Sequence, residues 1–201
     1  MPYTEWLLSR LPERVGCVLD LGCGCGELCR LIAPRAERVI GVDVSGAMIG
    51  RAQERCADAK NVEFVAGDMM DLQLPAGGCD AIVSMAALHH VDLAAVLSRA
   101  RGWLGAGGLM LNVDLRASEG ATDRLIDFIG AGGAGARAAL QRLSRDARSE
   151  ACDAWRAHLG HDCYLTVSEV RRICEKQLPG ADVRWRLRWR YTLEWRERGC
   201  V

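Results

Sequence analysis

Three thiols and three glycines are packed into LGCGCGELC, residues 21–29. Such a stretch could hold a metal ion or a redox pair through its thiols, or bring its backbone close to a ligand through its glycines. Cys23, Cys25 and Cys29 lack the C-x₂-C spacing of a structural zinc site. We therefore predict no metal here and assign the function of the loop to its glycines.

The elements around this loop indicate what it faces. A short apolar run over 15–21 ends at the loop, and a helical pattern that Pro34 closes follows it. A glycine loop between a strand and a helix aims backbone N–H groups at a ligand. Dinucleotide folds use G-x-G-x-x-G, whereas this loop reads G-x-G-x-G from Gly22 to Gly26, with Glu27 in the last place. This spacing disfavours an NAD-dependent oxidoreductase, which stays as a lesser alternative.

The chain up to Asp114 repeats this strand and helix unit. Further strands are predicted at 38–43, 61–66, 79–85 and 109–114, with helices over 45–56 and 92–104. Apolar strands that alternate with helices imply a parallel sheet covered on both faces, whose connections are right-handed. Ligands of such a sheet bind at the carboxyl ends of its strands.

The pattern changes after Asp114. Residues 116–159 read as irregular helices broken by GAGGAG at 130–135, which we interpret as an inserted cap. A helix is predicted over 166–177, and apolar residues alternate with arginines over 183–195, which is the period of a strand. This stretch is longer than an ordinary strand, so we predict two antiparallel strands with a turn near 187–189.

Two acidic residues complete an ordered set of motifs: Asp20 before the loop and Asp43 at the end of the second strand. The set resembles the class I S-adenosylmethionine-dependent methyltransferases. It consists of VLDLGCGCG (18–26), VIGVDVSGAMI (39–49), GDMMDL (67–72), CDAIVSMAALHHV (79–91) and LGAGGLMLNVD (104–114). More loosely, LHHV resembles the UbiE/UbiG-like branch (methyltransferase type 11). The resemblance implies an enzyme that transfers a methyl group from S-adenosylmethionine to an oxygen, nitrogen, sulfur or carbon atom of a small molecule.

The resemblance also implies an α/β architecture. We expect a doubly wound, mostly parallel seven-stranded sheet, the Rossmann-like methyltransferase fold, with a helical cap inserted after the fifth strand. One domain over 1–201 would contain an N-terminal lid segment, a cofactor-binding core, the cap, and the last helix with the C-terminal strands. Their respective bounds are 1–14, 15–115, 116–165 and 166–201.

A position for the cofactor follows from the same resemblance. Its methionyl part would lie against the loop backbone, Asp43 would accept both ribose hydroxyls, and Asp68 would bind the adenine amino group. Taken singly, an acid such as Asp68 is more often a cap or a surface charge. The expected cofactor residues are Asp20, Gly22, Cys23, Gly24, Gly26, Asp43, Val44, Asp68, Met69, Ser84 and Met85.

Methyl transfer is an in-line displacement on a sulfonium, so the protein chiefly supplies alignment and a dry pocket. His89 and His90 follow the fourth strand, where family members place residues close to the methyl group, and they are the candidate catalytic bases. Alternatively, one histidine caps the next helix and the other packs. The expected acceptor pocket draws on aromatic and polar residues of the cap, which could equally pack the cap on the sheet: Trp155, His158, His161 and Tyr164.

Composition argues against several other classes. The 26 basic and 26 acidic residues balance, so no overall charge attracts nucleic acid. We interpret the arginines at 184, 186, 188 and 190 as a solvated face rather than an RNA-binding surface, and SMAA (84–87) lacks the proline pair of DNA-adenine methyltransferases. Without a signal peptide or a long apolar run, we expect a cytoplasmic protein with reduced thiols and no membrane partner.

Some alternatives stay open at this stage. A catalytically silent methyltransferase-like subunit is the rival from another class of function. A methyltransferase that binds arsenite through thiols, with Cys152 and Cys163 available in the cap, has no specific support. The acceptor and the oligomeric state are not determined by these residues.

Overall fold

The computed structural model describes residues 2–120, 123 and 163–198. These residues form a seven-stranded sheet in the order β3-β2-β1-β4-β5-β7-β6. Its first five strands are parallel, and β7 runs antiparallel to both β5 and β6. The strands are β1 (Val15–Leu21), β2 (Ala36–Asp43), β3 (Val62–Ala66), β4 (Cys79–Met85), β5 (Leu104–Leu115), β6 (Asp182–Arg186) and β7 (Arg190–Arg196). The predicted doubly wound, mostly parallel sheet is therefore confirmed.

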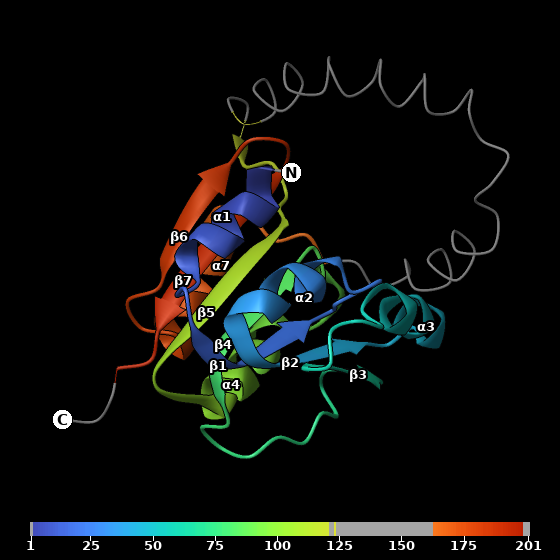
Figure 1. Ribbon diagram of the computed structural model, residues 1–201. Coiled ribbons are helices and arrows are strands. Elements are labelled where there is room, and N and C mark those ends of the chain that lie inside the picture. The colour runs from blue at the N-terminus through green and yellow to red at the C-terminus, as the bar shows by residue number, and fades with distance from the viewer. Residues whose placement is uncertain (1, 121–122, 124–162, 199–201) are drawn as a thin grey trace, which may run out of the picture.

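Helices cover both faces of this sheet, with α1 and α2 in front of it and α4 and α7 behind it in Figure 1. The helices are α1 (Pro2–Arg10), α2 (Glu27–Ile32), α3 (Gly46–Arg55), α4 (Leu93–Trp103) and α7 (Val167–Gln177), with short 3₁₀ turns η1 (Ala33–Arg35) and η2 (Leu88–His90). Two apolar clusters result. One packs Leu7, Ile32 and Ile49 on the α1 face, and the other packs α4 and α7 on the opposite face.

Polar side chains fix the starts of three helices. Ser45 accepts a hydrogen bond from the Met48 N–H at the start of α3, and Asp92 accepts one from Ala95 at the start of α4. Thr166 forms a reciprocal capping box with Glu169 at the start of α7. Ser45 and Thr166 are thus the N-cap residues of α3 and α7. Because Asp92 caps α4 itself, neither histidine is needed for that role.

β5 begins at Leu104 rather than at 109, earlier than the sequence pattern predicts. The glycine-rich stretch 105–108 forms a bulge, since Cys79 of β4 pairs with Leu104 while Ala81 pairs with Leu109. Gly107 has a φ of 77°, a conformation that glycine adopts without steric cost. Interrupted pairing through glycines is why the hydrophobic pattern missed the first part of this strand.

The two C-terminal strands form the predicted hairpin, in which Arg186 pairs with Arg190. Arg188 and Trp189, with φ angles of 60° and 53°, make the turn in the left-handed region although neither is a typical turn residue. Of the four arginines interpreted as one solvated face, Arg188 lies in the turn and not on a strand. Arg190 lies 5.9 Å from the centre of the Tyr3 ring of α1, so this face is partly covered.

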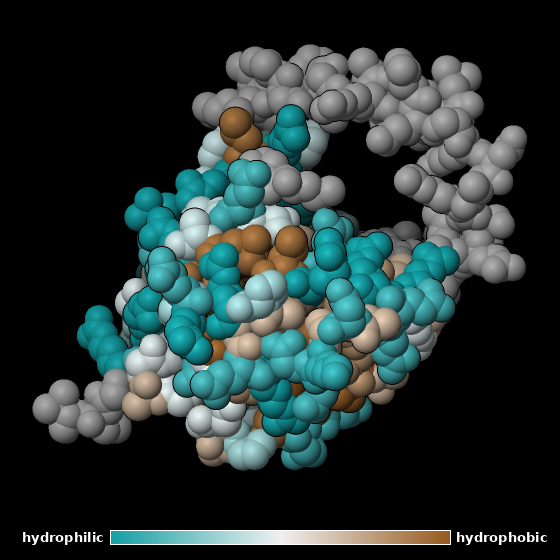
Figure 2. Space-filling model, viewed as in Figure 1, coloured by the Kyte–Doolittle hydropathy of each residue, from teal (hydrophilic) through white to brown (hydrophobic). Residues whose placement is uncertain are grey.

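Two findings concern the surface. No helix among residues 2–120, 123 and 163–198 is long and apolar enough to cross a membrane. The face shown in Figure 2 is mostly hydrophilic, and its apolar residues gather in small groups. Most of the predicted cap, including Trp155, His158 and His161, lies outside the described residues.

Candidate functional site

The glycine loop is held to the end of β2 through its backbone. The N–H groups of Gly22 and Cys23 both donate to the Val42 carbonyl, at 2.8 and 2.9 Å. Gly22, Gly24 and Gly26 have φ angles of 73°, 52° and 74°, all in the left-handed region. Only glycine adopts such angles at little cost, so the G-x-G-x-G spacing specifies the path of the loop.

The three glycines have different surroundings. A Cβ atom at Gly22 would collide with Ala87, and one at Gly26 would lie 2.9 Å from the Ala52 Cβ and 3.0 Å from the Phe64 ring. Apart from its chain neighbours, a Cβ atom at Gly24 would meet no atom of the described residues within 4 Å. The outer glycines therefore pack the loop tightly, while the middle one faces open space where a ligand can approach the backbone.

Asp43 ties this loop to the next one. Its Oδ2 accepts a hydrogen bond from the Gly24 N–H, and its Oδ1 accepts one from the Ser45 N–H, both at 2.9 Å. Each carboxylate oxygen can accept a further bond. Val44, directly after it, is 53% exposed at the same edge of the sheet. This arrangement can accept two neighbouring hydroxyl groups and offer an apolar side chain beside them.

Asp20 lies beneath the loop rather than in it. The buried carboxyl accepts a hydrogen bond from the Cys29 thiol at 3.2 Å. Burial, with a smaller contribution from the Asp43 charge, raises the pKa of Asp20 to about 7. The structure thus places this acid where a nearby cation would favour its ionised form.

The Cys29 thiol, just after the loop, is not poised for reaction. Contact with the Cys23 thiol, burial and the Asp20 carboxyl all raise the pKa of Cys29 above its ordinary value. A protonated thiol is a poor nucleophile and a poor metal ligand. In the part of the chain that the structure describes, no three His, Cys, Asp or Glu side chains gather so as to hold a metal ion.

Two expected adenine contacts lie on the loop after β3. The Met69 methyl group is 3.8 Å from the position that a Cβ of Gly22 would take, which places Met69 beside the glycine loop. Asp68 accepts a hydrogen bond from the Met70 N–H at 2.8 Å and so also shapes its own turn. Asp68 therefore has a local structural role whether or not it binds a ligand.

Ser84 and Met85 end β4 next to the glycine loop. The buried Ser84 hydroxyl donates to the Leu21 carbonyl at 2.8 Å and joins the tips of β4 and β1. Met85 accepts a weak bond from the Thr4 hydroxyl of α1, so this helix reaches the end of β4. Ala86 follows with a φ of 59°, unusual for a residue other than glycine. Backbone strain of this kind often marks functional sites.

The second part of the site is a buried pair formed by Asp114 at the end of β5 and His89 in the η2 turn. Asp114 accepts hydrogen bonds from the His89 backbone N–H at 3.1 Å and from the His89 ring, where Oδ1 and Nδ1 are 2.6 Å apart. The His89 and Asp114 side chains are only 3% and 1% exposed. Asp114 therefore fixes both the backbone and the ring of His89.

Two aromatic rings lie next to the His89 ring. The Tyr164 ring stacks on it at 5.2 Å between ring centres, and the His90 ring lies at 4.0 Å. The Cys163 N–H also donates to the His89 carbonyl at 2.8 Å. Of the four expected pocket residues, the structure thus brings Tyr164 to the candidate histidines, and the other three lie outside the described residues.

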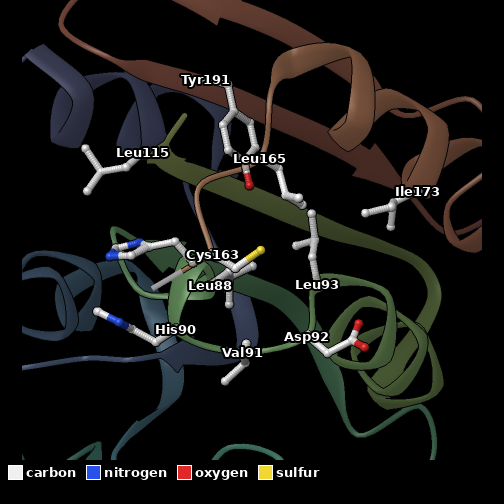
Figure 3. A pocket seen from close by; sticks show the side chains of 11 residues that line it. Leu88, His90, Val91, Asp92, Leu93, Leu115, Cys163, Leu165, Ile173 and Tyr191 are labelled. Atoms are coloured by element: carbon white, nitrogen blue, oxygen red, sulfur yellow. The ribbon is translucent and has the colours of Figure 1, made fainter. Parts of the chain in front are cut away.

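A cavity of about 450 Å³ opens beside these groups (Figure 3). It lies between the η2 turn, the start of α4, α7, the end of β5 and the start of β7. The lining residues are Leu88, His89, His90, Val91, Asp92, Leu93, Leu115, Cys163, Leu165, Ile173 and Tyr191. Its size and mostly apolar walls are those of a pocket for a small molecule.

Sequence reasoning missed Asp114 and Tyr191. Asp114 is the last residue of the motif LGAGGLMLNVD, and β5 lies directly beside β4 in the sheet. A strand-end acid next to the strand that precedes the histidines was the available signal. Tyr191 gave no such signal, because the alternating pattern of residues 183–195 indicated only that the Tyr191 side chain lies on the apolar face of its strand.

Comparisons with known proteins agree with this geometry. Residues 18–108 match the family described as "Methyltransferase domain". The chain is 40% identical over 109 residues to an uncharacterised methyltransferase of Mycobacterium tuberculosis, a match that covers 54% of this chain and 55% of that protein. The chain thus spans about half the length of the curated relatives it matches.

Solved structures give the same result for the fold. An S-adenosylmethionine-dependent methyltransferase from Mesorhizobium loti is 33% identical, with a TM-score of 0.52, over 56% of this chain and 54% of that one. The YcgJ protein from Bacillus subtilis is similar over 92% of this chain and 70% of that chain, with a TM-score of 0.65 and 23% identity, which shows a shared fold.

Proposed function

We propose that the protein is a class I S-adenosylmethionine-dependent methyltransferase, which binds S-adenosylmethionine and transfers its methyl group to a small-molecule acceptor. The match of residues 18–108 to the family described as "Methyltransferase domain" and the similarity to known methyltransferases support this proposal. The acceptor atom is an oxygen, nitrogen, sulfur or carbon. One observation carries the proposal: Gly24 faces open space, while Asp43 beside it holds two loops by its carboxylate oxygens.

The proposed cofactor position uses the chain's own groups. The loop from Gly22 to Gly24 holds the methionyl end, and Asp43 accepts the ribose hydroxyls. Val44 and Met69 flank the adenine, whose amino group Asp68 binds. When bound, the cofactor supplies an electrophilic methyl group on a sulfonium. The buried Asp20 lies below the methionyl end, where the ammonium group of the cofactor favours its ionised form.

His89 and His90 are the proposed catalytic groups, and Tyr164 is the proposed pocket residue among those described. The η2 turn supports this assignment because Ala87, just before it, contacts Gly22, while its own residues line the cavity. A small acceptor is supported by the size of that cavity, and the balanced charge supports a non-nucleic-acid acceptor. The motif LHHV supports a place for the protein in the UbiE/UbiG-like branch. We also propose that the protein is cytoplasmic.

Calorimetry with S-adenosylmethionine and S-adenosylhomocysteine tests the binding step. Micromolar binding of both ligands is expected. Binding of neither would favour a silent methyltransferase-like subunit, although such a subunit would not need Gly24 and Asp43 in their present arrangement. Binding of NADH, followed by its fluorescence, would instead revive the oxidoreductase alternative. Transfer of a labelled methyl group into pools of small molecules then tests the reaction.

A further inference from the structure

The 450 Å³ cavity has mostly apolar walls and little charge. Among the described residues that line it, there is no lysine or arginine. Asp92 is the only aspartate or glutamate in this set, and its carboxylate is engaged by the Ala95 N–H as the cap of α4. A phosphate or carboxylate buried here would find no lysine or arginine among these described residues, and an unpaired charge is costly in an apolar site.

Arg116 does not change this balance. It follows Leu115 in the chain, but it is not part of the cavity wall. Its guanidinium bonds the Asp123 carboxylate at 3.0 Å and lies 4.8 Å from the centre of the Trp185 ring. The positive charge next to the cavity is therefore already paired.

Two polar groups at the cavity can recognise an uncharged acceptor. Tyr191 points its hydroxyl group into the cavity in Figure 3. Burial, followed by the Asp114 charge, raises the pKa of Tyr191 well above its ordinary value. The Tyr191 oxygen accepts a hydrogen bond from the Asn112 amide at 3.2 Å, which leaves its proton for a donor bond.

His89 is the second polar group. Because Asp114 Oδ1 lies 2.6 Å from Nδ1, that nitrogen carries the proton in the neutral ring, and Nε2 has the lone pair. The titratable groups that surround His89 are Asp114 from β5, His90 from η2, Tyr191 from β7, and Cys163 with Tyr164 from the segment before α7. Asp114 is the one that bonds the ring directly.

We propose that the methyl acceptor is an uncharged, mostly apolar molecule whose attacking atom binds with its proton, and that His89, held by the positioning residue Asp114, removes this proton. This inference rests on the proposed function and deepens it. His89 Nε2 accepts the proton as the attacking atom bonds the methyl carbon and the carbon–sulfur bond breaks, with its electron pair staying on sulfur. The positive charge of the sulfonium thus passes to the imidazolium beside Asp114, and the proton then leaves to water.

The acceptor class is tested by calorimetry with two probes of similar shape, 2-naphthol and 2-naphthoate, in the presence of S-adenosylhomocysteine at neutral pH. We expect 2-naphthol to bind at least about tenfold more tightly than 2-naphthoate, a difference of about 1.4 kcal/mol. Equal or tighter binding of the carboxylate, or no binding of 2-naphthol, overturns the inference. If S-adenosylhomocysteine itself does not bind, the proposed function fails instead.

A charge placed in the cavity wall should reverse this preference. Ile173→Arg and Leu165→Arg each add a cation to the lining, and either variant that keeps the native circular dichroism spectrum serves the test. Leu31→Arg is the matched control, because Leu31 is exposed on α2, on the other face of the sheet. We expect tighter 2-naphthoate binding in the wall variants alone. The same affinity in all variants would place the probe outside this cavity.

The role of Asp114 is tested by nitrogen-15 NMR of the imidazole and by slow labelled methyl transfer to 2-naphthol. Asp114→Asn should abolish the Nδ1–H preference of His89 and lower transfer about 10²-fold without weakening S-adenosylhomocysteine binding. Asp80→Asn, at the opposite end of β4, is the matched control. An unchanged tautomer in Asp114→Asn, or no transfer by the wild-type protein, overturns the proton-removal step.

Discussion

The two ends of the candidate site are built in different ways. At the cofactor edge, formed by loop 22–26 and residues 43–45, each contact uses a backbone N–H group: Gly22 and Cys23 donate to the Val42 carbonyl, and Gly24 donates to the Asp43 carboxylate. At the acceptor edge, formed by η2, the end of β5, the start of β7 and residues 163–165, pairs of side chains are added to the backbone contacts, as in the pair of His89 and Asp114.

This difference has a functional consequence. Backbone contacts depend on φ angles and on glycines, so a few fixed positions specify the shape of the cofactor edge. Side-chain contacts can be replaced one at a time without moving the strands. A protein built in this way can change its acceptor while it keeps its cofactor, and the following experiments test whether the two edges are that independent.

Asp43→Ala should have the largest effect. It removes the proposed partner of both ribose hydroxyls and also the acceptor for the Gly24 and Ser45 N–H groups. We expect the binding of S-adenosylhomocysteine to weaken by about 2 to 5 kcal/mol in calorimetry. Asp43→Asn, which keeps the side-chain shape, should lose less. Unchanged affinity in Asp43→Ala would remove the main cofactor assignment.

The pH dependence of stability should report on Asp20. Its pKa is about 7 in the folded protein and lies near 3.8 when unperturbed, so the folded state holds the proton more tightly than the unfolded state. The stability from Asp20 is therefore greatest at acid pH and is lost as the pH rises from about 4 to about 7. Relative to Asp20→Asn, the free energy of unfolding of the wild-type protein should fall by up to about 4 kcal/mol as the pH rises across this range.

Urea denaturation at a series of pH values measures this difference. If the difference between the wild-type protein and Asp20→Asn stays constant with pH, the buried carboxyl does not titrate in this range. The affinity for S-adenosylmethionine provides a second readout. The ammonium group of this cofactor should favour the ionised form of Asp20, so the cofactor should bind more tightly as the pH rises towards 7.

Gly24→Ala and Gly26→Ala form a matched pair within the loop. Both residues have a positive φ, so each substitution costs about 1 to 2 kcal/mol of backbone strain. Gly26→Ala should cost about 1 to 3 kcal/mol more, because its Cβ would press on Ala52 and Phe64. Gly24→Ala should instead lower the free energy of S-adenosylhomocysteine binding by more than it lowers the free energy of unfolding. Equal losses of ligand affinity in the two variants would mean that Gly24 does not face the cofactor.

The cofactor edge could be predicted from the sequence because its information is local. The glycine spacing, Asp43 at a strand end and the Ser45 cap each lie within a few residues of the element that they shape. The parallel sheet followed from the alternation of strands and helices, whereas the strand order came only from the structure. Even the C-terminal hairpin, which turns at Arg188 and Trp189 without a turn residue, was predicted from the length of its alternating pattern.

The acceptor edge could not be predicted to the same degree. His89 and Asp114 are separated by 25 residues, and Asn112 and Tyr191 by 79, so only the pairing of β4, β5 and β7 brings them together. The sequence indicated His89 as a candidate but gave it no partner. Side chains that meet across three strands carry no spacing signal in the chain.

Ala86→Gly should have the smallest effect, at the joint between the two edges. Ala86 has a φ of 59° and is held there by a bond from its N–H to the Val113 carbonyl. Glycine removes about 1 to 2 kcal/mol of strain but adds about 0.5 to 1 kcal/mol of chain entropy to the unfolded state, so stability should rise by no more than about 1.5 kcal/mol. Arg188→Gly, with a φ of 60° in the hairpin turn, is the matched control. Both variants should gain similar stability in urea denaturation. Only Ala86→Gly should change how strongly S-adenosylhomocysteine binding affects 2-naphthol binding, because residue 86 precedes Ala87, which contacts Gly22. The same coupling in both variants would mean that the two edges act independently of this residue.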